Sequence, residues 1–213
     1  MNTAYYNDID LKNTAEFSKI KTDTFWSKDV DIFEQLILRY TKQDDLILFC
    51  SNGKNPYPAD LTIKLKRNHH EIPDFSDVSF SLAEKNIKQR LNLAGVKKYG
   101  LIIANIDISE NVRCFDLKFI DNIAKTAKYL GVGRFLALIA SDVYFDSECH
   151  LYSYKYAEML QDVGLKLKSP ICVESQKEPD TSQLWQHRAL ESGFNVISHK
   201  NIFVFQNLNC DRK

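Results

Sequence analysis

The sequence lacks a basic excess, a long apolar run and a paired cysteine motif, and each absence excludes a class of protein. Lysine plus arginine equals aspartate plus glutamate, at 28 each, whereas a stand-alone nucleic-acid-binding domain is usually strongly basic. No stretch approaches the roughly 18 consecutive apolar residues of a membrane span, and residues 1–10 are polar, unlike a signal peptide. The five cysteines are scattered without a C-x-x-C pair, so we expect reduced thiols in a cytoplasmic protein.

What is present is the composition of a folded domain. The chain has 213 residues, of which 44% are hydrophobic and 12% aromatic, and this composition argues against disorder. There are no internal repeats or low-complexity tracts. We expect an N-terminal arm over residues 1–24, one large α/β domain over residues 25–206 and a short tail over residues 207–213.

Apolar runs alternate with amphipathic segments along the chain. The runs predict strands at Leu46–Cys50, Leu101–Ala104, Arg134–Ala140 and Lys168–Glu174, and short closing strands at Asn195–Ser198 and Ile202–Phe205. The first three of these strands are expected to be central in the sheet and buried. The amphipathic segments predict helices after an N-cap at Ser27, over Leu61–Leu65, over Ser81–Leu93, over Phe115–Leu130 ended by Gly131, and over Tyr152–Val163. This alternation predicts a Rossmann-like, mainly parallel sheet of about six or seven strands, with helices on both faces and a C-terminal antiparallel hairpin.

Two of the predicted strands end in polar loops. Leu46–Cys50 continues into residues 51–56, and Leu101–Ala104 continues into residues 105–109. In an open α/β sheet, ligands bind at the carboxyl ends of the parallel strands. The edge of the sheet where these two loops begin, called the crevice below, is therefore the candidate functional site.

Several segments, taken together, carry a resemblance to a known family. They are residues 25–42 with 45–48, residues 99–105, residues 135–143, residues 152–165 with 171–174, and residues 195–205. In their order and pattern they resemble the amino-group DNA methyltransferases, which modify adenine N6 or cytosine N4. The resemblance covers residues 25–206, and it implies a methyltransferase fold, S-adenosylmethionine as cofactor and DNA as substrate.

The family's cofactor loop reads Asp-Pro-Phe-x-Gly-x-Gly, and its glycines let backbone amides approach S-adenosylmethionine. The corresponding stretch here keeps one glycine, lacks the acid, and adds Lys54 and Pro56, the second of which has no amide N–H. An acid at the end of the family's second strand holds the cofactor ribose. The residues that would bind the cofactor in an active enzyme are Cys50, Ser51, Asn52, Gly53 and Asp74.

The family's catalytic tetrapeptide begins with Asp, Asn or Ser, continues with two prolines and ends in an aromatic residue that stacks on the flipped base. Here it reads Asn105, Ile106, Asp107, Ile108. Isoleucine has no π-face, so most of the roughly 1–3 kcal/mol of stacking per base is lost. In an active enzyme the catalytic residues would be Asn105, Asp107 and Ile108.

Other candidate groups have plain structural explanations. Adjacent His69 and His70, followed by Glu71, lack the spacing of a metal site, and we expect no metal. Cys50 is expected to be a buried small side chain, and Asp142 to face the crevice or to cap the following turn. Six basic residues are expected to lie on solvated helix faces, and a phosphate-binding patch is the alternative. They are Lys64, Lys66, Arg67, Lys85, Lys88 and Arg90.

Three functions remain open. We favour a methyltransferase-like protein that has lost methylation, needs no cofactor and acts by binding a protein partner or DNA, away from membranes. The alternative is an active S-adenosylmethionine-dependent DNA amino-methyltransferase with divergent motifs. The third is another Rossmann-like enzyme that has reused the crevice. Calorimetric titration with S-adenosylmethionine discriminates among them.

Overall fold

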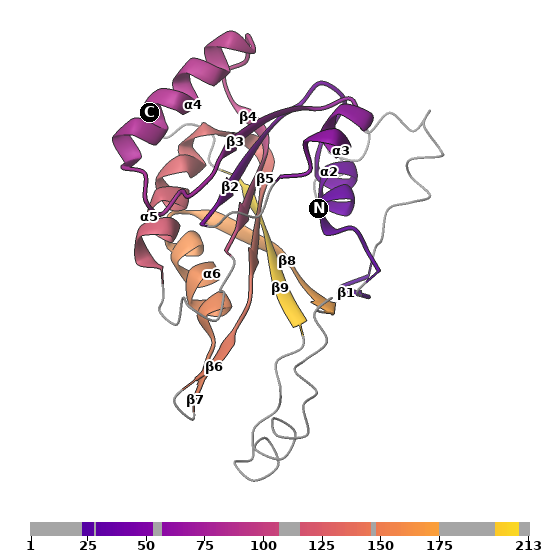
Figure 1. The fold of residues 1–213 in the computed structure, drawn as a ribbon, viewed down its shortest axis with the longest axis vertical. Helices are drawn as coiled ribbons and strands as arrows, with labels where there is room; N and C mark the ends of the chain where they lie inside the picture. Colours follow the sequence, from indigo (N-terminus) through magenta and orange to yellow (C-terminus); the bar gives the residue numbers. More distant parts are fainter. Residues whose placement is uncertain are drawn as a thin grey trace.

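The fold is one twisted sheet between two layers of helices (Figure 1). The computed structural model describes residues 23–27, 29–52, 57–106, 116–145, 148–174 and 199–208. The strands are β1 (Phe25–Trp26), β2 (Leu46–Ser51), β3 (Asn68–Ile72), β4 (Tyr99–Asn105), β5 (Leu130–Ala140), β6 (Val143–Phe145), β7 (Glu148–His150), β8 (Leu165–Glu174) and β9 (His199–Asn207). The helices are α2 (Ile32–Tyr40), α3 (Ala59–Lys64), α4 (Phe80–Leu93), α5 (Leu117–Thr126), the 3₁₀ turn η2 (Ala127–Tyr129) and α6 (Tyr152–Asp162).

The main sheet has seven strands in the order β1-β8-β9-β5-β4-β2-β3. All pairs are parallel except those of β9, which runs antiparallel between β5 and β8. The predicted fold class is therefore confirmed, including an antiparallel hairpin, which β8 and β9 form. The predicted short strand Ile202–Phe205 lies in β9 and pairs with β5 and β8, while Asn195–Ser198 lies outside the described residues.

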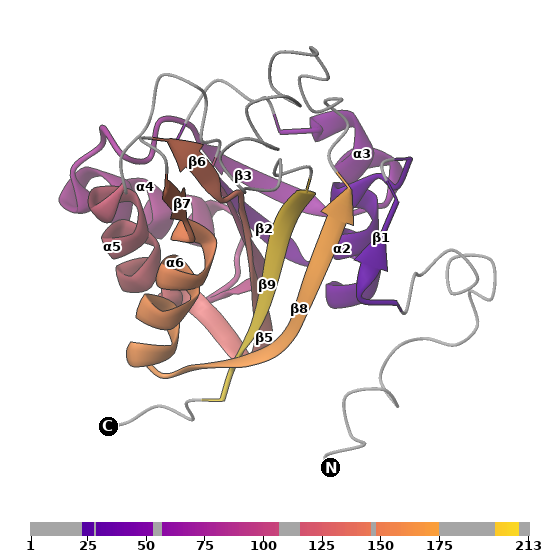
Figure 2. The same ribbon diagram turned by 90° about the horizontal axis from the view of Figure 1, so that it is seen from below.

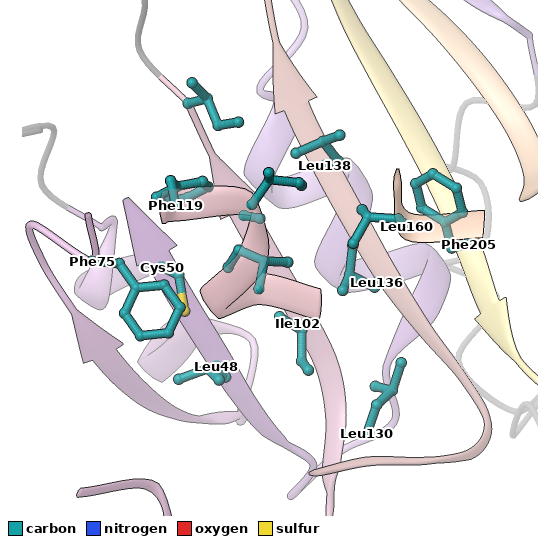
Figure 3. Close-up of a cluster of buried hydrophobic side chains, with 14 of the residues drawn as sticks. Leu48, Cys50, Phe75, Ile102, Phe119, Leu130, Leu136, Leu138, Leu160 and Phe205 are labelled. Atoms are coloured by element: carbon teal, nitrogen blue, oxygen red, sulfur yellow. The ribbon is translucent and has the colours of Figure 1, made fainter. Parts of the chain in front are cut away.

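Helices cover both faces of the sheet, with α4, α5 and α6 on one side and α2 and α3 on the other (Figure 2). Alternate residues of each central strand enter the two cores. In β2, Leu48 and Cys50 face the α4–α6 layer, shown in Figure 3, while Ile47 and Phe49 face the α2–α3 layer. All four side chains are fully buried, which stabilises the fold by about 1.5–3 kcal/mol for each large apolar group. The predicted burial of the three central strands is confirmed.

Two predicted boundaries were wrong. The helix predicted over Phe115–Leu130 ends at Thr126 and closes with η2, because Leu130 is already in β5, where it is buried opposite Tyr99. The helix predicted after Ser27 begins at Ile32. Its N-cap is Asp31, whose carboxylate accepts the Glu34 N–H at 3.0 Å.

The third difference concerns a strand that the sequence analysis did not predict. Residues 68–72 read as a polar segment, but they form β3, which pairs with β2 at the end of the sheet. An edge strand tolerates polar and charged side chains because one of its sides faces solvent. A small second sheet of β6 and β7 was also not predicted.

No helix within the described ranges is long and apolar enough to cross a membrane. The expected domain boundaries stay predictions, since residues 1–22 and 209–213 lie outside those ranges.

Candidate functional site

The structure brings the first residues of the two predicted loops, Ser51 and Asn105, to the same edge of the sheet. Ser51, the last residue of β2, is paired with Asn105, the last residue of β4, and Asn105 is paired in turn with Ile139 of β5. Ser51 and Asn105 are both buried. Predicted site residues Gly53, Asp107 and Ile108 lie outside the described residues. The carboxyl ends of β2 and β4 thus form the described part of the crevice.

The loop after β3 reaches this crevice from the side. The Phe75 N–H donates to the Ser51 carbonyl at 2.7 Å, and the Asn122 side-chain amide donates to the Phe75 carbonyl at 2.9 Å and to the Val78 carbonyl at 3.2 Å. Asp74 is exposed, with a φ of 49° in the left-handed region. Its carbonyl accepts the Asp77 N–H at 2.8 Å in a turn. Asp74 therefore lies beside the end of β2, and its role in holding a cofactor ribose stays a prediction.

The inner wall of the crevice is closely packed. Phe75 and Phe119 are fully buried and meet edge to face with their ring centroids 6.1 Å apart. Cys50 and Ile106 belong to the same cluster of buried side chains, and Figure 3 shows Phe75 beside Cys50. Burial raises the pKa of the Cys50 thiol far above its ordinary value, so this thiol stays protonated and is a poor nucleophile.

Backbone donors along this edge are already used within the protein. The Ile106 N–H donates to the Ile139 carbonyl at 2.8 Å, and the Ala59 N–H donates to the Tyr57 carbonyl at 2.8 Å. The Tyr57 N–H reaches the Glu71 carboxylate at 3.4 Å. Pro58 precedes α3 and has no N–H. These three amides, with that of Phe75, are therefore committed to internal partners.

The Asn105 side chain is different. It is 7% exposed, and no partner of its carboxamide is found among the residues that the structure describes. Its carboxamide is therefore not committed to any of the residues that the structure describes.

Asp142 caps a helix instead of facing the crevice. Its carboxylate accepts the Ser153 N–H at 2.9 Å and the Asn201 side-chain amide at 3.0 Å, and the Asn201 amide also reaches the Ser153 hydroxyl at 2.9 Å. The N-cap residue of α6, Leu151, makes no side-chain cap of its own. The Asp142 carboxylate therefore caps the N-terminus of α6. Of the two roles that the sequence left open, facing the crevice or capping the following turn, the structure shows a capping role.

The two histidines contact different elements, as expected for adjacent residues of a strand. The Nδ1 atom of His69 lies 3.0 Å from the Thr62 hydroxyl of α3, and the Nδ1 atom of His70 lies 2.6 Å from the Tyr99 hydroxyl of β4. Within the described ranges, no group of three or more His, Cys, Asp or Glu side chains could hold a metal ion.

The set of basic residues proposed for a phosphate patch is divided by the structure. Arg67 is buried, and its guanidinium donates to the Thr41 hydroxyl at 3.1 Å and to the Leu65 carbonyl. Lys88 pairs with Glu84 at 3.3 Å. Arg90 donates to the His69 carbonyl at 3.0 Å. Only part of the set is therefore available to an external anion.

Sequence reasoning missed the contributions of Phe75 and Asn122 to the crevice. The only signal for Phe75 was an aromatic residue within a polar stretch, and Asn122 is 47 residues further along the chain. Such a contact has no local pattern, because it depends on how the loop after β3 meets α5.

Comparison with known proteins finds no matching family model and no matching curated protein. Among solved structures, an S-adenosylmethionine-dependent methyltransferase from Methanosarcina mazei is similar at 12% identity and a TM-score of 0.46, covering 81% of this chain and 97% of that one. The 16S rRNA methyltransferase KamB is similar at 12% identity and a TM-score of 0.44, covering 82% and 92%. A candidate DNA modification methylase from Thermus thermophilus is similar at 11% identity and a TM-score of 0.33, covering 80% and 49%. The strand order of the chain itself, and not these similarities, defines the fold.

Proposed function

We propose that this chain is a methyltransferase-like protein that does not transfer methyl groups and acts by binding a protein or nucleic-acid partner. The observation that carries the proposal is the use of the crevice amides. The N–H groups of Tyr57, Ala59, Phe75 and Ile106 all have acceptors inside the protein. A cofactor held by backbone amides would have to compete with these bonds, each worth about 0.5–1.5 kcal/mol.

The acceptor side of the crevice supports the same proposal. Ile106 occupies the place of the first proline of the catalytic tetrapeptide, and its side chain is 2% exposed within the core. Isoleucine at position 108 offers no ring for stacking, and Asp107 adds a negative charge that a nucleic acid would repel. A flipped base would therefore have no aromatic ring to stack on and would lie near the negative charge of Asp107.

A specific observation favours the alternative, an active S-adenosylmethionine-dependent DNA amino-methyltransferase. Asp74 is exposed beside the end of β2, and the Asn105 carboxamide is without a partner among the described residues. Both residue types match the family at these positions, as does the remaining glycine of the cofactor loop, Gly53. In such an enzyme Cys50, Ser51, Asn52, Gly53 and Asp74 would line the cofactor site, and the cofactor would supply an electrophilic methyl group.

Calorimetric titration separates the two. We expect no saturable heat with S-adenosylmethionine or its demethylated product at micromolar concentrations. A Gly53→Val variant serves as the control, because a β-branched side chain would obstruct a cofactor in the loop. Micromolar binding that the Gly53→Val change abolishes would overturn the proposal and support the enzyme.

Partner binding is tested separately, by fluorescence anisotropy with labelled single-stranded and duplex DNA over a range of salt concentrations. Saturable, salt-dependent binding identifies a nucleic-acid partner. If DNA does not bind at low salt, the proposal narrows to a protein partner. Methyl transfer to that DNA would contradict the proposal, whether the partner is a nucleic acid or a protein.

A further inference from the structure

A shallow hollow of about 190 Å³ lies on the opposite side of β3 from α3, and none of its lining residues belongs to the candidate site. It is lined by His70 of β3 and by Asn86, Gln89, Arg90 and Leu93 of α4. The helical residues are spaced three and four apart, so they share one face of α4. The lining side chains include one cation and three uncharged polar groups, and none of them is a carboxylate.

Arg90 is held in place at this hollow. Its guanidinium donates to the His69 carbonyl at 3.0 Å, on the open side of β3, which is the edge strand of the sheet. A guanidinium is a planar fork of N–H donors, so one bond to the backbone orients the group and leaves its other donors for a ligand. The anchored fork needs little reorganisation to bind an anion.

His70 presents a neutral donor to the same hollow. Burial, with smaller contributions from the charges of Arg90 and His69, lowers the pKa of His70 to about 4, so the imidazole is neutral at physiological pH. Burial also raises the pKa of Tyr99 far above its ordinary range. The Tyr99 hydroxyl is therefore protonated, and within the described ranges the Nδ1 atom of His70, 2.6 Å away, is its acceptor. On this basis we assign the imidazole proton to Nε2, the tautomer in which Nδ1 accepts from the Tyr99 hydroxyl.

We propose that this hollow binds a phosphate group, with the Arg90 guanidinium as its charged donor and the Nε2–H of His70 and the Asn86 and Gln89 amides as neutral donors. Arginine forks match the oxygen geometry of phosphate, and charge-assisted bonds of this kind are the strong ones. A tetrahedral phosphate accepts from several directions at once, which suits donors on both the strand and the helix. The group belongs either to a small phosphate compound or to a nucleic-acid backbone.

The proposal goes beyond the proposed function, because the hollow and the crevice are formed by different residues. Titration with S-adenosylmethionine therefore does not test it. It also refines the phosphate-binding patch that the sequence analysis gave as the alternative to solvated helix faces: of those basic residues, Arg90 is the one that lines the hollow.

The test uses the full chain and titrates inorganic phosphate while side-chain NMR signals of Arg90 and His70 are followed. We expect saturable shifts at millimolar concentrations. Arg90→Gln should weaken binding about tenfold or more, as expected for losing a charge-assisted bond. Lys88→Gln is the matched control, because it removes the same charge only two residues from Arg90. The Lys88 side chain is 61% exposed and pairs with Glu84.

A second readout separates binding from a general charge effect. A bound phosphate should raise the pKa of His70 in the native protein and in Lys88→Gln, because an anion favours the imidazolium, and should raise it much less in Arg90→Gln. The charged and titratable groups that face His70 are Arg90 of α4, His69 of β3 and Tyr99 of β4. Asn86→Ala, a change at an exposed position, should weaken phosphate binding without altering the pKa of His70 in the absence of phosphate.

A labelled oligonucleotide distinguishes the two sources of phosphate. If Arg90→Gln weakens oligonucleotide binding and Lys88→Gln does not, the site takes a nucleic-acid phosphate. If only inorganic phosphate shows the difference, the site takes a small phosphate compound. Equal affinities of Arg90→Gln and Lys88→Gln for both probes would overturn the proposal.

Discussion

At the scale of single residues, His70 couples the stability of the fold to pH. Its pKa is lowered from 6.5 to about 4 in the folded protein, first by burial and then by Arg90 and His69. The folded state therefore binds fewer protons than the unfolded chain between these values. The contribution of this group is fully present above pH 6.5 and is lost as the pH falls toward 4.

We predict that acidification over this window lowers the free energy of unfolding of the native protein by about 2 kcal/mol more than that of a His70→Gln variant, after allowance for partial exposure. Glutamine keeps a hydrogen-bonding group next to Tyr99 but does not titrate. Urea unfolding at several pH values measures the difference. Parallel loss of stability in both proteins would show that His70 does not titrate as described.

The ion pair of Asp45 and Arg134 leaves no room for a side chain at Gly100. A Cβ atom at Gly100 would lie 2.7 Å from Cγ of Asp45. Asp45 cannot easily move, because its carboxylate binds the Arg134 guanidinium at 2.9 Å and 3.0 Å and accepts the Lys42 N–H at 2.8 Å.

We predict that Gly100→Ala destabilises the protein by about 1–3 kcal/mol, the usual cost of overpacking. The control is the double variant Asp45→Gly with Gly100→Ala, which removes the Asp45 side-chain atoms, including Cβ at 2.9 Å, that a Cβ at position 100 would meet. The second substitution should then add much less than it does alone. Additive effects in thermal or urea unfolding would locate the cost elsewhere.

At the scale of elements, α6 depends on a residue outside itself. Asp142 follows β5, and its carboxylate joins the first turn of α6 to Asn201 of β9. Three elements therefore share one buried carboxylate, which is 7% exposed.

We predict that Asp142→Ala costs about 2–3 kcal/mol, because it leaves the Ser153 N–H without its acceptor and takes one of two acceptors from the Asn201 amide. Asp142→Asn should cost less, since its oxygen can still accept one of the bonds. Asp31→Ala, which removes an exposed N-cap from α2, provides the comparison at about 1 kcal/mol. Equal costs for the two alanine variants would argue against the three-element link.

At the scale of the whole molecule, methyl transfer requires donor and acceptor sites to be complete together. Positioning the two reactants contributes on the order of 7–11 kcal/mol to such a reaction. We therefore predict no transfer of labelled methyl groups to mixed genomic DNA by the native chain or by the triple variant Ile106→Pro, Asp107→Pro and Ile108→Tyr.

The structure adds a control to this experiment. The Ile106 N–H donates to the Ile139 carbonyl, and proline at position 106 would remove that donor. Ile108→Tyr alone restores the aromatic ring without this cost, and it should also be inactive while unfolding like the native protein. Activity in the native chain would mean that its motifs are divergent but functional.

Much of the central architecture was readable from the sequence. Strands β2, β4 and β5 are covered on both faces, so nearly every position must be apolar, and this produces continuous runs such as Leu46–Cys50. Because the runs alternate with amphipathic helices, they also indicated a parallel sheet, and hence the edge at which Ser51 and Asn105 meet. Local pattern was sufficient for these central strands.

Only the tertiary structure decided the rest. β3 has one open side, so its polar residues gave no strand pattern, and its pairing with β2 made it a strand. The bond between His70 and Tyr99 joins residues 29 apart, and that between Asn122 and the Phe75 carbonyl joins residues 47 apart. The sequence by itself determined which segments must be buried, because burial leaves a local periodic signal. The tertiary structure decided which polar groups meet, because a hydrogen bond between distant residues leaves none.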